Sequence, residues 1–88
     1  MSEKSYQEVW NNCLSIIKDN VTPQNFKTWF KPIKAVALDQ KILTIQVPSQ
    51  FFYEWLENNY ITLIKKTIKR ELGKDAKLEY NILLDASS

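Results

Sequence analysis

The sequence is poor in the side chains that proteins use for catalysis and metal binding. Its 88 residues contain no histidine, one cysteine and one glycine. Histidine is the commonest general acid–base group, a lone cysteine can form neither an internal disulfide nor a cysteine-based zinc site, and one glycine cannot build a glycine-rich phosphate loop. We therefore expect a non-enzymatic protein that needs no cofactor and resides in the reducing cytoplasm.

The chain also lacks a strong charge of either sign and a long apolar run. Twelve basic and ten acidic residues give a net charge of +2, which is too balanced for a strong binder of nucleic acid or of a membrane surface. No apolar run approaches the ~18 residues that span a membrane. The length and the 44% hydrophobic content suit one domain with one core. We expect this domain to cover residues 1–83 and a linker to begin at 84–88.

Two helices are predicted in the N-terminal third. Ser5 to Glu8 has the S-x-x-E form of a capping box. Apolar residues then recur at steps of three and four and form one stripe, which predicts a helix over 5–20: Tyr6, Val9, Trp10, Cys13, Ile17 and Val21. Thr22-Pro23 is a second helix start, and Pro32 ends this helix, so it covers about 23–30.

The rest of the chain predicts a hairpin, a third helix and a last strand. Short alternating segments at 33–38 and 42–47 flank a turn. Ser49 can cap a helix that runs to Leu72, where Gly73 suits the C-cap. A third strand begins at Leu78. The expected fold is α+β, in the order helix, helix, strand, strand, helix, strand, with a small three-stranded sheet packed against helices.

Phe51 lies well off the buried stripe that we predict for the third helix. At about 100° per residue, that stripe contains Phe52, Leu56, Tyr60, Leu63, Ile64 and Thr67. An exposed phenylalanine near a helix start is a candidate contact for a partner, because aromatic residues are enriched in interface hot spots. The alternative is that Phe51 folds back onto the hairpin, and periodicity does not decide between the two.

Trp10 has two interpretations as well. It lies on the apolar stripe of the first helix, which is typical of a core residue. That helix is apolar over a wide arc, however, and an arc that a small core leaves uncovered would favour self-association. Cys13 lies on the same stripe and is expected to be a small buried hydrophobe.

A basic group follows on the polar side of the third helix. Lys65, Lys66, Lys69 and Arg70 lie away from its apolar stripe. They are possible contacts for phosphate groups, or a solvated face that keeps the domain soluble.

Three segments together resemble a known family. They are WNNCLSIIKDN, then F-x-x-W-F-K-P-I-K-A, and then L-x-I-x-V-P-S-x-F-x-x-x-W-L-x-x-x-Y. Across Trp10 to about Ile82 the chain resembles the N-terminal domain of the bacterial chromosomal replication initiator. The resemblance implies a KH-like fold in the order given above. The chain has no GXXG loop of the kind that nucleic-acid-binding KH modules use.

The resemblance also implies a role and a set of contact residues. Such a domain has no catalytic activity; it mediates self-association at the replication origin, helps recruit the replicative helicase and docks regulatory proteins. Trp10 matches a tryptophan at the self-association surface, with Val9 and Cys13 as neighbours. Phe51 matches an aromatic that contacts the helicase or single-stranded DNA. Asn25 stands where some members carry a glutamate that contacts the helicase, and the amide lacks that charge.

A second function stays open at this point. A single-strand nucleic-acid-binding module would use Phe51 for stacking on bases and the group from Lys65 to Arg70 for phosphates. Under either function we expect Trp29, Phe30 and Trp55 to be mainly structural, and no membrane partner.

Overall fold

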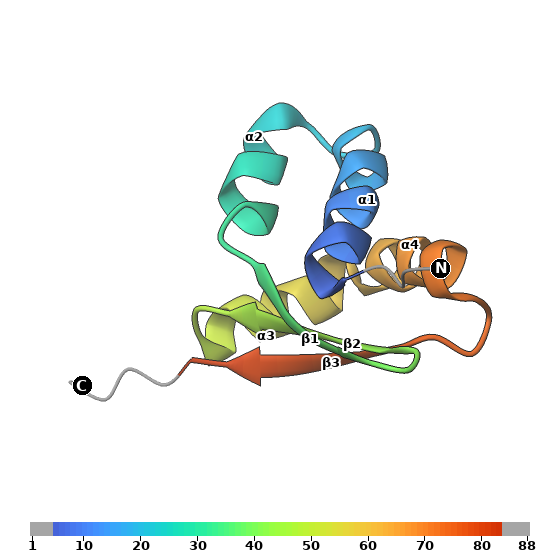
Figure 1. Ribbon diagram of the computed structural model, residues 1–88. Coiled ribbons are helices and arrows are strands. Elements are labelled where there is room, and N and C mark those ends of the chain that lie inside the picture. The colour runs from blue at the N-terminus through green and yellow to red at the C-terminus, as the bar shows by residue number, and fades with distance from the viewer. Residues whose placement is uncertain (1–4, 84–88) are drawn as a thin grey trace.

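The computed structural model describes residues 5–83. Its helices and strands follow the order helix, helix, strand, strand, helix, helix, strand (Figure 1). They are α1 (Tyr6–Lys18), α2 (Pro23–Asn25), η1 (Phe26–Phe30), β1 (Lys34–Asp39), β2 (Ile42–Val47), α3 (Gln50–Asn59), α4 (Ile61–Leu72) and β3 (Lys77–Ile82). The predicted α+β class is confirmed. The expected linker at 84–88 lies outside the described residues.

Three helix starts are capped by the residues that the sequence suggests. The Ser5 hydroxyl accepts a hydrogen bond of 3.1 Å from the Glu8 backbone N–H at the start of α1. Thr22 and Ser49 accept equivalent bonds of 3.1 and 3.2 Å at the starts of α2 and α3. Each hydroxyl satisfies one backbone donor that has no partner within the helix. These caps fix where each helix begins, and therefore which face it turns to the sheet.

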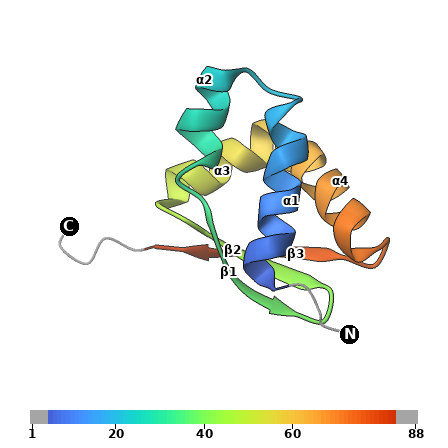
Figure 2. The same cartoon turned by 45° about the horizontal axis from the view of Figure 1, so that its top comes forward.

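The three strands form one mixed sheet with β2 in the centre. Strands β1 and β2 are antiparallel, and β2 and β3 are parallel. The hairpin between β1 and β2 turns at Gln40, whose φ of 59° is left-handed, and the pairing shifts register between Ala35 and Ala37. The helices lie over one face of the sheet (Figures 1 and 2), so only that face needs to be apolar.

The alternation of β2 matches this one-sided cover. Leu43, Ile45 and Val47 are fully buried, while the residues between them are half-buried. In β3, Leu78, Tyr80 and Ile82 pair with those three positions and pack against the core. The sheet and the helices therefore share one core, as expected for a domain of this size.

The expected single helix from Ser49 to Leu72 is wrong, because it is two helices that break at Tyr60. This residue has φ −130° and ψ 1°, outside the helical region. The Tyr60 ring lies 5.1 Å from Phe30 and 5.2 Å from Trp55, measured between ring centroids. We attribute the break to this packing of the Tyr60 ring. Asn58 and Asn59, which precede it, are weak helix formers and offer little resistance to the break.

The second predicted helix has the expected range but not the expected geometry. Its first turn, α2, is α-helical, and η1 continues it as a π-helix. The Lys31 backbone N–H bonds to the Phe26 carbonyl at 3.1 Å, five residues back. Such turns are rare and often lie at functional sites. Residue spacing gave no signal for it.

Candidate protein interaction surface

Two tryptophans from different helices stack face to face at one end of the helical layer. Trp29 comes from η1 and Trp55 from α3, with ring centroids 3.7 Å apart and planes only 2° from parallel. Both are half-buried, so one side of the pair packs on the core and the other reaches solvent. A stack of two rings has little conformational freedom, which makes it a stiff support for its neighbours.

Phe51 lies at the edge of this stack and points away from the core. It is 68% exposed, the largest value among the exposed large hydrophobic residues of the described chain. Its ring centroid is 6.5 Å from that of Trp29, and the Phe52 ring lies 5.0 Å from Trp29. The exposed alternative is therefore confirmed over a ring folded onto the hairpin. We name Trp29, Phe51, Phe52 and Trp55 the aromatic cluster.

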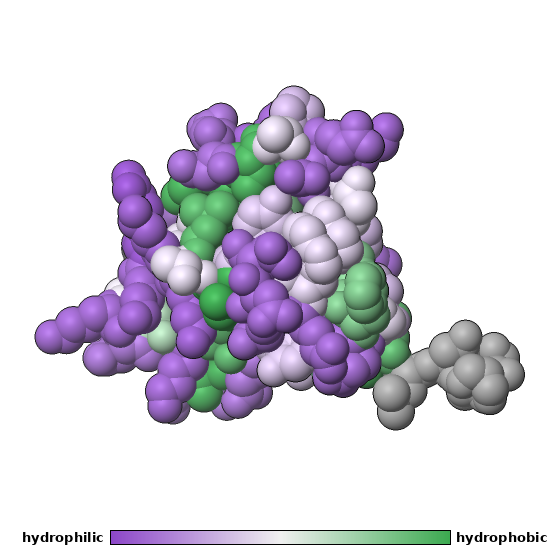
Figure 3. Space-filling view, turned by 180° about the vertical axis from the view of Figure 1, so that it is seen from behind, coloured by the Kyte–Doolittle hydropathy of each residue, from purple (hydrophilic) through white to green (hydrophobic). Residues whose placement is uncertain are grey.

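Figure 3 shows the molecule from the side opposite to the view of Figure 1. On this face, green and pale side chains lie among strongly hydrophilic ones (Figure 3). The aromatic cluster adds an exposed apolar patch around Phe51 to the surface of the domain. Such a patch is the usual mark of a binding surface.

Our expectation that Trp29 and Trp55 are mainly structural missed their place beside Phe51. Trp29 packs on the core and also lies beside the exposed Phe51 ring, and Trp55 stacks on Trp29. One signal was present in the sequence: Phe51 and Trp55 stand four residues apart, and side chains at that spacing are neighbours on a helix. The contribution of Trp29 from η1 is a tertiary contact that spacing cannot reveal.

Val9, Trp10 and Cys13 lie inside the core, which differs from the surface role that the resemblance implies but agrees with the core interpretation of Trp10 and Cys13. Their side chains are 0%, 2% and 0% exposed, because α1 packs against α4, β1 and η1 on that side. A side chain without exposed area cannot contact a second molecule while the domain stays folded. The Trp10 indole N–H is also buried without a hydrogen-bond partner among the described residues.

Comparison with known proteins decides the family. A sequence model described as the DnaA N-terminal domain matches residues 7–70. The chain belongs to this family. It is 56% identical over 82 residues to the chromosomal replication initiator protein DnaA of Flavobacterium psychrophilum, covering 93% of this chain and 17% of that protein. It is 50% identical over 88 residues to DnaA of Bacteroides fragilis, covering 100% of this chain and 18% of that protein.

The match of this DnaA N-terminal domain extends to more distant relatives. DnaA of Chlorobaculum tepidum is 46% identical over 81 residues, covering 92% of this chain and 16% of that protein. The chain thus spans about a sixth of the length of the curated relatives it matches. Each of these relatives is named as a chromosomal replication initiator protein.

Asn25 sits at the junction of α2 and η1 in this DnaA domain. It is half-buried, and its backbone N–H donates to the Thr22 hydroxyl. Within residues 5–83, no hydrogen bond joins its side chain to the aromatic cluster. Its predicted helicase contact therefore stays a prediction.

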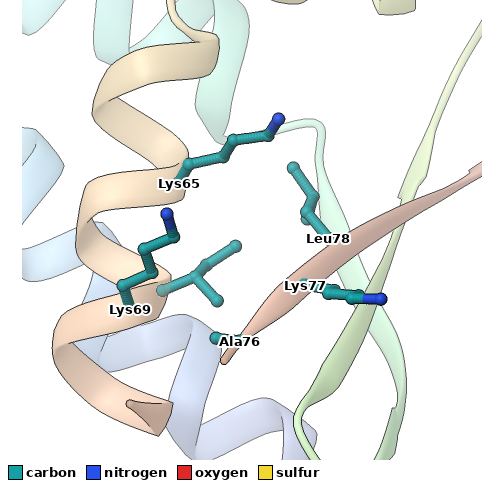
Figure 4. Close-up of a pocket in the computed structure, with 6 residues that line it drawn as sticks. Lys65, Lys69, Ala76, Lys77 and Leu78 are labelled. Atoms are coloured by element: carbon teal, nitrogen blue, oxygen red, sulfur yellow. The ribbon is translucent and has the colours of Figure 1, made fainter. Parts of the chain in front are cut away.

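The four basic residues of α4 are all exposed but do not share one hollow. Lys65 and Lys69 line a hollow of about 320 Å³ against the start of β3, together with Ile68, Ala76, Lys77 and Leu78. Lys66 and Arg70 line a different hollow of about 180 Å³, against Ile16 and Asn20 at the end of α1. In the close-up, Lys65 and Lys69 extend over the first hollow, whereas the Lys77 ammonium group points away (Figure 4).

Tyr80 has a clearly shifted pKa. Burial raises the pKa of its hydroxyl above the usual range, and the neighbouring Glu57 carboxylate raises it further. The hydroxyl has no hydrogen-bond partner of standard geometry among residues 5–83, and its ring packs edge-on against Tyr53 at 4.6 Å. Tyr80 lies on the covered face of the sheet and is half-buried.

None of the described helices has both the length and the apolar character that crossing a membrane requires.

Proposed function

We propose that this chain is a non-catalytic protein-interaction domain of a replication initiator. It self-associates at the origin, helps recruit the replicative helicase and docks regulatory proteins. The observation that carries the proposal is the exposed Phe51 ring held at the edge of the stacked Trp29–Trp55 pair. The family supports the biological setting, since the relatives are named as chromosomal replication initiator proteins.

The aromatic cluster suits protein recognition for a physical reason. A phenylalanine offers a large apolar area with only two rotatable side-chain bonds, so little entropy is lost when a partner covers it. Its position beside the tryptophan stack limits the orientations it takes before binding. Preorganised aromatic residues of this kind carry much of the binding energy in small interfaces.

Self-association has a different surface in this proposal. Val9, Trp10 and Cys13 are buried, so they act by fixing the position of α1. Tyr6, which is 40% exposed, is the aromatic of α1 that a second copy can reach. A shallow groove of about 460 Å³ lies beside it, between α1 and β1. Because one helix patch buries little area, the dimer is weak and forms only at high concentration.

A crossed pair of variants tests the proposal. Binding of the helicase from the same organism is measured by isothermal titration calorimetry, and self-association by sedimentation equilibrium. We expect Phe51→Ala to weaken helicase binding at least about tenfold and to leave self-association unchanged. Tyr6→Ala removes another exposed ring and is the matched variant. We expect it to weaken self-association and to leave helicase binding unchanged. Equal helicase affinity of wild type and Phe51→Ala at an intact fold refutes the role of the aromatic cluster.

A second candidate function, binding of single-stranded nucleic acid, has one specific observation in its favour. Lys65 and Lys69 extend over one hollow whose other lining residues are aliphatic, apart from Lys77 (Figure 4). No carboxylate lines that hollow, so a phosphate group there would relieve the repulsion between two ammonium groups. A base could then stack on an exposed aromatic ring.

Salt dependence and a charge-matched control separate the two functions. An oligonucleotide binder loses affinity steeply as salt rises, and a double variant Lys65→Ala/Lys69→Ala reduces both affinity and slope. The double variant Lys66→Ala/Arg70→Ala removes the same charge but from the other hollow. Equal loss in both variants, or no measurable binding of a thymidine oligonucleotide by wild type, counts against this second function.

A further inference from the structure

A second groove of this domain lies on another side of η1 and is not part of the aromatic cluster. It has a volume of about 400 Å³. Its lining comes from the last turn of α1, the connection to α2, and η1: Lys18, Asp19, Val21, Pro23, Phe26, Lys27 and Lys31. None of the cluster residues Trp29, Phe51, Phe52 and Trp55 contributes to it.

The π-helical turn assembles one wall of this groove. Because the Lys31 backbone N–H bonds to the Phe26 carbonyl, residue 31 returns to a position above residues 26 and 27. A regular α-helix would turn residue 31 about 140° away from residue 26. The rare geometry thus brings Lys31 to the side of the half-buried Phe26 ring, where it stands with the exposed Lys27. π-Helical turns recur at functional sites for this kind of reason.

The floor and the rim of the groove have different chemistry. Val21 and Phe26 are half-buried and apolar, and Pro23 adds an apolar ring beside them. Phe26 is held from behind by its stack on the buried Phe30, with ring centroids 6.1 Å apart. Around this floor stand three exposed lysines and one aspartate. The local charge is therefore +2, in a domain whose total charge is also only +2.

We propose that this groove docks an acidic segment of a partner protein, one with an apolar side chain flanked by aspartate or glutamate residues. The apolar side chain packs on Val21, Pro23 and Phe26. The flanking carboxylates pair with the ammonium groups of Lys18, Lys27 and Lys31 around the rim. These side chains are exposed, so they can adjust their positions to the carboxylates of the partner. This complementarity sets the class of the partner and steers its approach. The proposal is independent of the aromatic cluster, and it adds a second docking site to the same domain.

The test uses isotope-labelled 88-residue chain and a synthetic 12-residue peptide in which two leucines stand among aspartates. We expect the peptide to shift amide resonances of the groove residues in two-dimensional NMR, with those of Phe51 and Trp55 unmoved. Lys27→Glu/Lys31→Glu weakens binding at least about tenfold, because two attractions become repulsions. Lys74→Glu/Lys77→Glu, an equal charge change at exposed positions outside the groove, leaves the affinity within about twofold.

An altered peptide completes the test. Leucine-to-serine changes should abolish the shifts, because the apolar floor then loses its ligand. Four outcomes overturn the proposal: no shifts at millimolar peptide, shifts at the aromatic cluster instead, equal binding of the serine peptide, or tighter binding of a thymidine oligonucleotide to the same residues. Groove shifts that grow with protein concentration in the absence of peptide also overturn it, because the occupant is then a second copy.

Discussion

Trp10 on α1 and Phe51 on α3 are both large aromatics within amphipathic helices, and the fold uses them in opposite ways. Trp10 is 2% exposed and Phe51 is 68% exposed. Helix α1 is enclosed on its apolar side by α4, β1 and η1, whereas Phe51 stands in the first turn of α3 and lies at the edge of the Trp29 ring.

This difference teaches that a helix pattern shows which face is apolar but not how much of it is covered. The cover comes from other elements, whose positions depend on the whole chain. A tryptophan matched to an interaction role by resemblance can therefore lie in the core, while the most exposed ring stands elsewhere. Substitutions at the two positions should separate folding from binding, and the expected effects below are ordered from the largest to the smallest.

The largest loss is expected for Trp10→Ala. It removes a buried ring from a close-packed core, a change that costs about 3–5 kcal/mol of unfolding free energy. Since domains of this kind have about 5–15 kcal/mol in total, much of the variant should be unfolded. Urea denaturation followed by circular dichroism measures this. Trp10→Phe, which retains a ring and removes the unpaired indole N–H, is the control and should lose clearly less.

The opposite result would mean that the Trp10 side chain lies at the surface. If Trp10→Ala keeps its unfolding free energy within about 1 kcal/mol of wild type but no longer self-associates, the indole contacts a second copy and the comparison with Phe51 fails.

An intermediate loss is expected for Trp55→Ala. The ring is half-buried and stacked on Trp29, and aromatic pairs contribute about 0.5–1.5 kcal/mol beyond the area they bury. We expect a total loss of about 1–3 kcal/mol. The stacked indoles should also give a strong near-ultraviolet circular dichroism signal that disappears in this variant. Trp55→Phe keeps a ring in place and should retain most of the stability. A wild-type spectrum that does not change on substitution contradicts the stack.

Phe51→Ala is expected to change stability very little. The ring is mostly in water already, so its removal should alter the unfolding free energy by no more than about 0.5 kcal/mol. The same variant should lose helicase binding. It should therefore lose binding and keep its stability, whereas Trp10→Ala should lose stability. Urea denaturation alongside the binding measurement checks both. A stability loss above about 1.5 kcal/mol would mean that the ring is covered in solution, for example by a second copy.

Local sequence rules predicted much of this fold. Ser5, Thr22 and Ser49 cap helices as expected, and the alternation of Leu43, Ile45 and Val47 gives the covered face of β2. These features depend on neighbours in the sequence, so spacing contains the information.

The features that the sequence did not predict depend on contacts between distant segments. Tyr60 breaks the long helix where its ring meets Phe30, thirty residues earlier. Of the candidate site, the exposure of Phe51 was one of two open alternatives, and the support from Trp29 was not foreseen. The burial of Val9, Trp10 and Cys13 was obscured because the resemblance assigned them a surface role, although their place on the apolar stripe favoured the core.

Tyr80→Phe should have the smallest effect at neutral pH and a distinct one in alkali. The Tyr80 hydroxyl is buried, and its contact with the Glu57 carboxylate lacks standard hydrogen-bond geometry, so removing it should change stability at pH 7 by no more than about 0.5 kcal/mol. The pKa of this hydroxyl is raised in the folded state, mainly by burial. Above the ordinary tyrosine pKa of about 10, the unfolded chain therefore loses this proton while the folded chain keeps it. Stability then falls as pH rises, by up to about 1.4 kcal/mol per pH unit for one proton.

Urea denaturation from pH 8 to 12 measures this fall. The unfolding free energy should fall less steeply for Tyr80→Phe than for wild type. The control Tyr6→Phe, which changes an exposed ring, should follow wild type. Parallel curves for all three proteins would mean that the Tyr80 hydroxyl reaches water. The helices would then cover this face of the sheet less completely than the core covers the apolar face of α1.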